Sequence, residues 1–271
     1  MAITSPPAVR RPSRWDLASR QADYWLTVYR RTWRGTAISS FVTPLLYVLS
    51  MGVLLGGFIE ADPATLDGAT TYLAFVAPGL VAAHTMQLVI GEMTYPVMSM
   101  VKWQKIAFGM TATPLSARDV INAHLGFLMA RLVLVDAVFL TVLAPFGVYA
   151  SVLGVVGAFL TQLLLGLAFA TPMYAISAGL KDESGFALVF RLGVIPMFLF
   201  SGAFFPISNL PPVLEWLARL TPLWHGVDLT RMCTLGTLDG PQALVHVVYL
   251  TAVAAAGYWW VGRRLERRLT T

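Results

Sequence analysis

The chain has 271 residues, of which 57% are hydrophobic and only 12% are charged. Soluble chains average roughly a quarter charged residues, so this composition excludes an ordinary soluble domain. The chain contains a single cysteine, Cys233. One cysteine excludes an intramolecular disulfide and a cysteine-rich metal site, and we predict no metal centre.

Apolar runs of roughly 20 residues, long enough to cross a hydrocarbon core about 30 Å thick, recur along the chain. We predict an all-α polytopic membrane protein, because the many short alternating strands of a barrel are absent from the sequence. The six predicted transmembrane helices are 36–59, 70–92, 119–146, 151–178, 186–205 and 242–262. The transmembrane domain is then 36–262, preceded by a cytoplasmic region 1–35 and followed by a basic cytoplasmic tail 263–271.

Basic residues near the ends of the predicted spans explain the net charge of +5. When the N-terminus is placed in the cytoplasm, sixteen of the 19 Lys and Arg residues lie on the cytoplasmic side. Only Arg219 and Arg231 lie outside, and Arg131 lies within a span. Cytoplasmic loops of membrane proteins carry such an excess of basic residues, so we expect both termini inside. The charge needs no nucleic-acid partner.

Aromatic and apolar residues recur at helical spacing before the first span. They are Trp15, Ala22, Trp25, Leu26, Tyr29 and Trp33, with most arginines elsewhere on the helical wheel. This pattern predicts an amphipathic helix lying in the cytoplasmic interface of the membrane. The helix either fixes the topology as a charged anchor or also touches a cytoplasmic partner, and the sequence leaves both interpretations open.

The inner connection 93–118 is the longest cytoplasmic loop, yet it is too short to be a domain. Its apolar residues alternate with Lys102 and Lys105, which predicts a short amphipathic helix. Pro114 then biases the preceding residue toward an extended backbone. Ser116, followed three residues later by Asp119, predicts the capped start of the next helix. From periodicity alone, this loop could equally be an ordinary linker.

The segment 206–235 is half polar and rich in proline, although it lies between two hydrophobic runs. Pro211 and Pro212 fit the first turn of a short helix, whose Glu215 and Arg219 form an i,i+4 pair. Thr221 predicts the cap of a second short helix. We interpret the segment as a re-entrant helical hairpin in the outer leaflet that acts as a gate; a passive surface loop is the alternative. The predicted gate residues are Phe205, Pro206, Leu214, Leu217, Pro222 and His225.

Two stretches make the chain similar to a known family. They are "TPLSARDV" after the inner loop and "FPISNLPPVLEWLARLTPLWHGVDLTR" before the last span. Together with the basic N-terminal helix and the order of spans, they resemble the ABC-2 type (type V) permeases, in particular those of nodulation-factor and daunorubicin export systems. The resemblance covers essentially the whole chain, and the second stretch is the more specific of the two.

The resemblance implies a permease subunit of an ATP-driven exporter in the inner membrane of a prokaryote. Such subunits form homodimers or heterodimers on two copies of a separate ABC ATPase, among membrane lipid, and export amphipathic drugs, lipids or lipid-linked and lipo-oligosaccharides. It also implies that the inner loop is a coupling helix seated on the ATPase. The residues carried over to that contact are Lys102, Lys105, Ile106, Phe108, Thr113, Pro114 and Leu115.

A phosphate-binding loop needs a Gly-Lys pair, and the sequence has none. We therefore expect that this chain is not an enzyme, that it binds no cofactor itself, and that ATP and Mg²⁺ are bound by the partner. Two alternatives remain at this stage. A secondary transporter or channel would work without an ATPase, and a membrane-embedded enzyme would need reactive groups such as His225 and Asp228.

Charged side chains inside a membrane are costly and usually face protein or water. Arg131 and Asp136 lie within the third predicted span, five residues apart and therefore not on one face. Either they face a translocation path, or they form ion pairs that hold helices together. His84, Glu92 and Gln162 are more simply explained as interhelical hydrogen-bonding residues.

Overall fold

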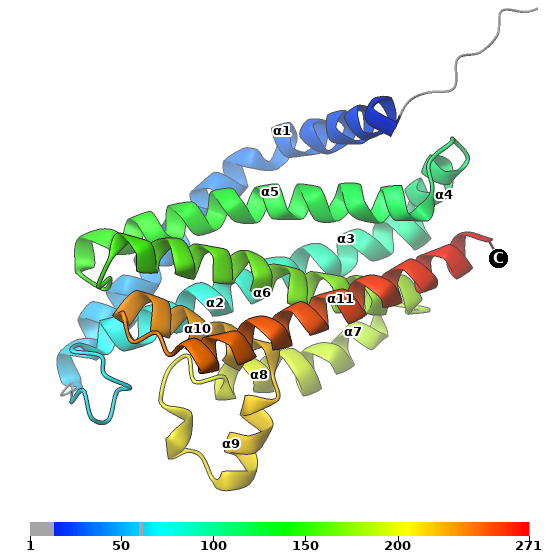
Figure 1. Ribbon diagram of the computed structural model, residues 1–271. Coiled ribbons are helices and arrows are strands. Elements are labelled where there is room, and N and C mark those ends of the chain that lie inside the picture. Colours follow the sequence, from blue (N-terminus) through cyan, green and yellow to red (C-terminus); the bar gives the residue numbers. More distant parts are fainter. Residues whose placement is uncertain (1–13, 60–61, 271) are drawn as a thin grey trace, which may run out of the picture.

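The computed structural model describes residues 14–59 and 62–270. Within these ranges the chain is helical and contains no strand, which confirms the predicted all-α class. The long helices run roughly side by side and form an elongated bundle (Figure 1). Residues 1–13 of the predicted N-terminal region and Thr271 of the basic tail lie outside the described part.

The elements are given in chain order, with α for α-helices and η for 3₁₀ and π segments. They are α1 (Arg14–Tyr47), η1 (Val48–Leu55), η2 (Gly56–Phe58), α2 (Tyr72–Met93), α3 (Tyr95–Met98), η3 (Ser99–Trp103), α4 (Ile106–Thr111), α5 (Ala117–Leu143), η4 (Ala144–Phe146), α6 (Val152–Gly179), α7 (Ser184–Val189), η5 (Phe190–Val194), α8 (Ile195–Phe200), η6 (Ile207–Asn209), α9 (Pro212–Arg219), α10 (Pro222–Leu235) and α11 (Gly240–Thr270).

Among the described residues, five helical stretches are long and apolar enough to cross a membrane. They are Trp33–Phe58, Tyr72–Trp103, Ala117–Phe146, Val152–Gly179 and Gly240–Leu269. The fifth predicted span corresponds to a shorter apolar helix, Ser184–Phe200. The chain leaves that helix at Ser201, earlier than the predicted end at 205, and turns at Gly202, which has a φ of +79°. The count of six spans therefore stays a prediction.

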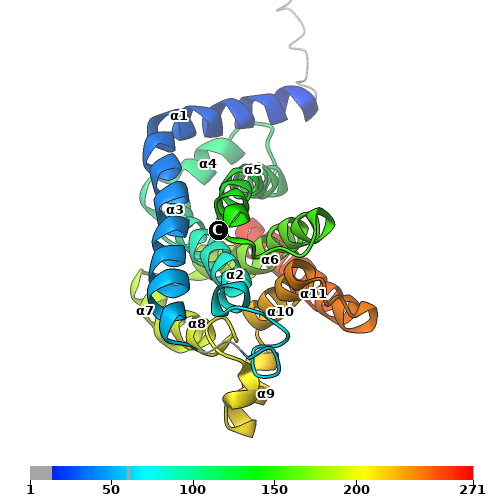
Figure 2. The same cartoon turned by 90° about the vertical axis from the view of Figure 1, so that its left-hand side faces the viewer.

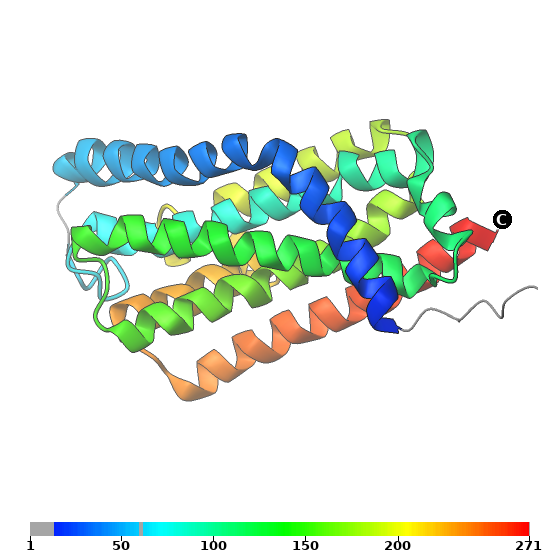
Figure 3. The same cartoon turned by 90° about the horizontal axis from the view of Figure 1, so that it is seen from above.

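The predicted interface helix and the first part of the predicted first span form one continuous helix, α1, and the span then continues through η1 and η2. Figures 2 and 3 show how α1 bends: its first part lies across the bundle, and the rest turns to run along it. We call the first part, residues 14–33, the N-terminal arm. The span that follows is mostly exposed, as expected of side chains that face lipid.

The core of the bundle is built around α2, which is buried on nearly all sides. Its side chains Phe75, Val76 and Met86 are completely buried, which is typical of a helix that is apolar all round. On one side, α6 and α11 approach so closely that a Cβ at Gly257 would lie 2.7 Å from the backbone nitrogen of Pro172. A glycine is therefore required at this crossing, because no larger residue could be accommodated.

The second span is longer than the sequence predicted. Its backbone breaks at Thr94, just before Pro96, and the helix then continues through α3 and η3 to Trp103. Val97 and Val101, which were assigned to the inner loop, are buried in this extension. The spacing of apolar residues did not predict this continuation, because a proline can begin a new helical turn directly after a break in the helix. The exposed inner connection is accordingly shorter, about 104–116.

Candidate functional site: the inner loop and the outer hairpin

The inner connection carries the short helix α4, as expected. Lys105 precedes it with a left-handed backbone, at a φ of 53°, and so turns the chain sharply into the helix. Ile106 and Met110 pack against the main hydrophobic core. Phe108, two residues from each, points to another side of α4 and is half-buried. Lys105, Thr113 and Pro114 are exposed, so the predicted coupling residues lie partly on the surface, and their coupling role stays a prediction.

The two predicted coupling lysines have different environments. The Nζ of Lys102 donates a hydrogen bond to the carbonyl of Lys181, in the turn between α6 and α7, whereas Lys105 is exposed. In the same turn, the carboxylate of Asp182 accepts hydrogen bonds from the hydroxyl and from the backbone N–H of Ser184. The hydroxyl bond first, and the backbone bond after it, lower the pKa of the Asp182 carboxyl. The two inner connections are thus joined, and Lys102 contributes to this link.

The far end of the inner connection is fixed by the predicted cap. Ser116 Oγ accepts a hydrogen bond from the backbone N–H of Asp119, and Asp119 accepts one from the backbone N–H of Ser116. This confirms the capping box. The hydroxyl of Thr113 donates a hydrogen bond to the carbonyl of Met110 at 2.6 Å. The chain just after α4 is therefore also held by a hydrogen bond. Pro114 and Leu115 then connect the two helices, so a displacement of α4 would reach α5 directly.

The outer segment forms the two short helices that the sequence predicted, α9 and α10. Pro212 is the first residue of α9, and Arg219 pairs with Glu215 at 2.6 Å. Thr221 caps α10, because its hydroxyl accepts from the backbone N–H of Trp224 at 3.3 Å. Both predicted starts and the ion pair are confirmed; the re-entrant position and the gating role stay predictions.

The predicted gate residues are divided between two environments. Helix α9 projects from the bundle (Figures 1 and 2), and Leu217 on it is 47% exposed. Helix α10 packs into the bundle against α2, α6 and α11, so that His225 is buried. Pro206 is also buried, whereas Phe205, Leu214 and Pro222 are intermediate. Of the two hairpin helices, α10 is therefore packed in the bundle and α9 is mostly exposed.

Arg231 on α10 contacts several elements at once, whereas the sequence analysis assigned it only to an outer loop. Its guanidinium is buried and donates hydrogen bonds to the carbonyls of Gly202, at 2.7 Å, and Phe75, at 3.4 Å. It also pairs with Asp67 at 3.3 Å and lies over the ring of Phe75. One side chain thus joins α10, the start of α2, the turn after α8 and the first outer loop.

His246 is a second residue that the sequence analysis left without a role. Its Nε2 lies 3.1 Å from a carboxylate oxygen of Asp228, and its Nδ1 lies 2.7 Å from Nδ1 of His225. Both imidazoles are buried, and the ring of Tyr249 stacks on His225. A hydrogen bond between two Nδ1 atoms requires one of them to carry the proton. This chain of groups fastens α10 to α11, which accounts for His225 and Asp228 without an enzymatic role.

The charged residues of the third span contact α2 rather than each other. Arg131 forms an ion pair with Glu92, and Asp136 accepts a hydrogen bond from Thr85 at 3.0 Å. Similarly, Gln162 on α6 donates to Thr230 on α10 at 2.8 Å. These contacts favour the interpretation that Arg131 and Asp136 hold helices together. Within 14–59 and 62–270, no group of three or more His, Cys, Asp or Glu side chains could hold a metal ion.

Residues 23–235 match the profile of the family described as ABC-2 type transporter. The chain belongs to the ABC-2 type transporter family. It is similar to Nodulation protein J of Rhizobium leguminosarum bv. trifolii, with 30% identity over 78% of this chain and 81% of the relative. It is also similar to Nodulation protein J of Rhizobium meliloti strain 1021, with 28% identity over 90% of this chain and 94% of the relative.

A further relative is the inner membrane transport permease YadH of Escherichia coli strain K12. It is 25% identical over 84% of this chain and 86% of its own length. The family match and the apolar helices identify this ABC-2 chain as a multi-pass membrane transport permease. The resemblance drawn from the inner and outer stretches is thereby confirmed. The matched region includes both the inner connection and the hairpin.

Proposed function

We propose that this ABC-2 chain is the permease subunit of an ATP-driven exporter and that a separate ABC ATPase hydrolyses the ATP. The family match over residues 23–235 carries the proposal. The sequence contains no Gly-Lys pair and hence no phosphate-binding loop of its own. Two permease subunits, identical or related, would bind two ATPase copies, which would hold the ATP and Mg²⁺.

The proposed cargo is an amphipathic molecule, namely a drug, a lipid, or a lipid-linked or lipo-oligosaccharide. The similarity to nodulation proteins supports this class, since two of the relatives described above carry that name. Export would start in the cytoplasm or the inner leaflet. The name of the Escherichia coli relative supports a place in the inner membrane.

In the proposed mechanism, the inner connection transmits movement of the ATPase to the bundle. Phe108 on α4 would enter a groove of the ATPase, and closure of the ATPase on nucleotide would displace α4. The capping box at Ser116 makes the connection to α5 stiff, and Lys102 links the movement to α7 through the carbonyl of Lys181. At the outer end, α10 would act as the gate, held by Arg231 and by the pair of His225 and His246.

Reconstitution tests this function most directly. The chain is purified together with an ABC ATPase encoded beside it, and hydrolysis is measured in lipid vesicles with each class of amphipathic cargo. We expect co-elution and a rate that rises several-fold with the correct cargo. Transport that proceeds without any ATPase, driven by an ion gradient, would instead establish a secondary transporter. Channel-like flux with no coupling would also overturn the proposal.

The proposed orientation, with both termini cytoplasmic, is tested by thiol labelling from outside the cell. In a variant with Cys233→Ala, single cysteines replace Ser208 or Asp239 at the outer end and Lys105 or Asp182 at the inner end. All four positions are exposed. We expect an impermeant maleimide to label only the outer two in intact cells, and all four after permeabilisation. Labelling of the inner pair in intact cells would reverse the orientation.

A further inference from the structure

Two buried histidines join α10 to α11, and the export mechanism proposed above makes no use of their ability to bind protons. The Nδ1 atoms of His225 and His246 lie 2.7 Å apart, and Nε2 of His246 lies 3.1 Å from the carboxylate of Asp228. The side-chain amide of Gln242 also donates to Asp228, at 3.0 Å. We call His225, His246 and Asp228 the histidine latch. It lies near one end of the bundle, since His246 is only about 9 Å along α11 from its first residue, Gly240.

The hydrogen bonds of the latch depend on how many protons it carries. A neutral imidazole has one donor and one acceptor nitrogen, whereas both nitrogens of the cation donate. When both rings are neutral, His225 donates to Nδ1 of His246, and Nε2 of His246 donates to Asp228. One added proton is still accommodated, because a charged His246 donates from both nitrogens to Asp228 and to His225. A second proton is not, since two charged rings would point N–H groups at each other across 2.7 Å.

The surroundings of the latch make this second proton costly. The ring of Tyr249 stacks on His225 with centroids 3.8 Å apart, and Trp224 meets the two imidazoles edge to face at 4.8 Å and 5.1 Å. These aromatic rings separate the pair from water. Burial and then the neighbouring His246 lower the pKa of His225, which lies on α10 outside the five candidate spans, to about 4.

The other charged groups near the latch lie on neighbouring elements. They are Arg219 and Glu215 of α9, Arg231 of α10, and Asp67 and Asp239 of the outer loops. The backbone of Arg219 and then the carboxylate of Asp228 favour a charged His225, but less strongly than burial opposes it. Helices α6 and α8 carry no acidic, basic or histidine side chain. On α2, His84 and Glu92 contact α5 instead.

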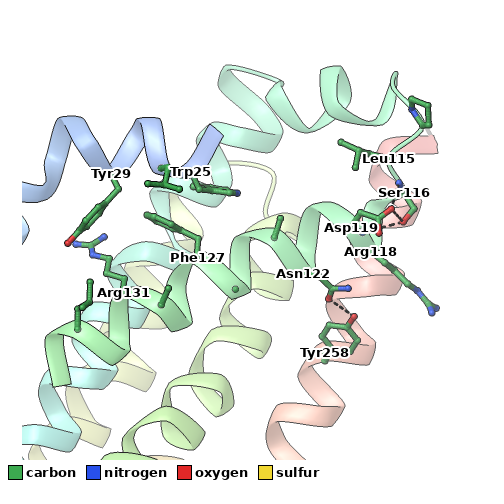
Figure 4. A pocket seen from close by; sticks show the side chains of 16 residues that line it. Trp25, Tyr29, Leu115, Ser116, Arg118, Asp119, Asn122, Phe127, Arg131 and Tyr258 are labelled. Carbon is green, nitrogen blue, oxygen red and sulfur yellow. Dashed lines mark hydrogen bonds between the residues drawn. The ribbon is translucent and has the colours of Figure 1, made fainter. Parts of the chain in front are cut away.

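Helix α11 is held in the bundle without the latch, whereas the first half of α10, residues 222–229, depends on it. The hydroxyl of Tyr258 on α11 donates to Asn122 on α5 at 2.7 Å, the hydrogen bond drawn as a dashed line in Figure 4. The second half of α10 is held by the buried guanidinium of Arg231. Loss of the latch would therefore free the first half of α10 from α11.

We propose that the histidine latch is a proton-sensitive switch, closed near neutral pH, which releases the first half of α10 when both of its imidazoles are charged. In the released state His225 meets water, where its ordinary pKa is 6.5, whereas its pKa in the closed state is about 4. The closed state is therefore fully stable above about pH 6.5 and loses stability as the pH falls toward 4. The proposal concerns the contact of α10 with α11 and does not depend on the proposed export function. If α10 is the gate, acid at this end would loosen it.

Val227→Cys, combined with Cys233→Ala, reports on the switch, because Val227 lies in the first half of α10 and is completely buried. The purified full-length protein reacts with a pyridyl disulfide, which modifies thiols even in acid, and the rate is divided by that of the denatured protein at the same pH. We expect this normalised rate to rise about ten-fold or more between about pH 7.5 and pH 4.5. Adding His225→Asn should remove the rise, since the amide keeps a hydrogen-bonding group near the Nδ1 position but does not take up a proton.

Two controls separate the latch from a general effect of acid. Ala175→Cys with Cys233→Ala places the thiol in the buried core on the second half of α6 and should stay protected at both pH values. His84→Gln removes a histidine from α2 and should leave the rise at Val227→Cys intact. Hydrogen exchange of backbone amides 222–229, corrected for its intrinsic pH dependence, repeats the measurement on the unmodified chain.

Three outcomes would overturn the proposal. The first is a normalised rate and a hydrogen exchange that do not change with pH. The second is an equal rise in the presence of His225→Asn. The third is an equal rise at Ala175→Cys, since acid would then unfold the whole bundle rather than release α10.

Discussion

Phe108→Asp is expected to abolish the stimulation of ATP hydrolysis by cargo while the spans still insert. Phe108 is half-buried on α4, on a different side from Ile106 and Met110, which pack against the core of the bundle. In the proposed complex, a charge at Phe108 would enter an apolar contact with the ATPase and cost several kcal/mol. Transmission requires contacts that differ between nucleotide states, so stimulation should fall at least ten-fold. Hydrolysis and co-elution with the ATPase are measured on the purified complex.

Lys105→Asn is the matched control for this variant. It removes a nearby exposed charge but keeps a residue type that tolerates the left-handed backbone at a φ of 53°. Exposed ion pairs contribute only about 0–1 kcal/mol, so coupling should change little. Ile106→Asp is less informative, because it would also place a charge against the core. If Phe108→Asp binds the ATPase and couples like the parent, α4 does not enter the ATPase.

Arg231→Met is expected to release the outer hairpin and to lower the stability of the protein by about 3–5 kcal/mol. The substitution leaves the buried carbonyls of Gly202 and Phe75 without their donor and removes the ion pair with Asp67. Buried acceptors without partners are costly, which gives this effect its size. Thermal unfolding in detergent measures the loss. In the proposed complex, basal ATP hydrolysis should rise at the same time, because the proposed gate would be loosened.

Arg219→Met serves as the control for the loss of an arginine from the same hairpin. Arg219 is exposed, and its two contacts, the ion pair with Glu215 and the ring of Trp224 at 5.5 Å, are local, so the effect on unfolding should be below about 1 kcal/mol. Arg231→Lys should recover part of the stability, since an ammonium group can reach fewer of the acceptors. Equal unfolding temperatures for Arg231→Met and Arg219→Met would show that Arg231 does not hold the hairpin.

The features that sequence analysis predicted correctly depend on neighbouring residues. The cap at Ser116, the cap at Thr221 and the pair of Glu215 and Arg219 each join residues within four positions of one another. Such interactions follow from helix geometry alone, and so they can be recognised without a structure. The apolar runs likewise identified the long helices, because the membrane requires their length.

The features that were missed join distant parts of the chain. His225 and His246 are 21 residues apart, and Arg231 reaches Phe75 across 156 residues. No local pattern marks such partners, since they depend on how the helices pack. Charge asymmetry placed Arg231 near the outside, but its burial depends on the turn at Gly202. Similarly, the extension of α2 beyond Thr94 is stabilised by the burial of Val97 and Val101 in the bundle.

The close crossing of α6 and α11 has a consequence for how the bundle deforms. At Gly257 the two backbones are almost in contact, and nearby the hydroxyl of Thr171 donates to the carbonyl of Ala254 at 2.9 Å. Sliding or rotation at this point would bring backbone atoms of the two helices into collision. We therefore expect α6 and α11 to move together as one rigid unit. Any conformational cycle must then bend the chain elsewhere. The bend in α1 and the break at Thr94 interrupt regular helix, so we expect bending there, relative to a fixed pair of α6 and α11.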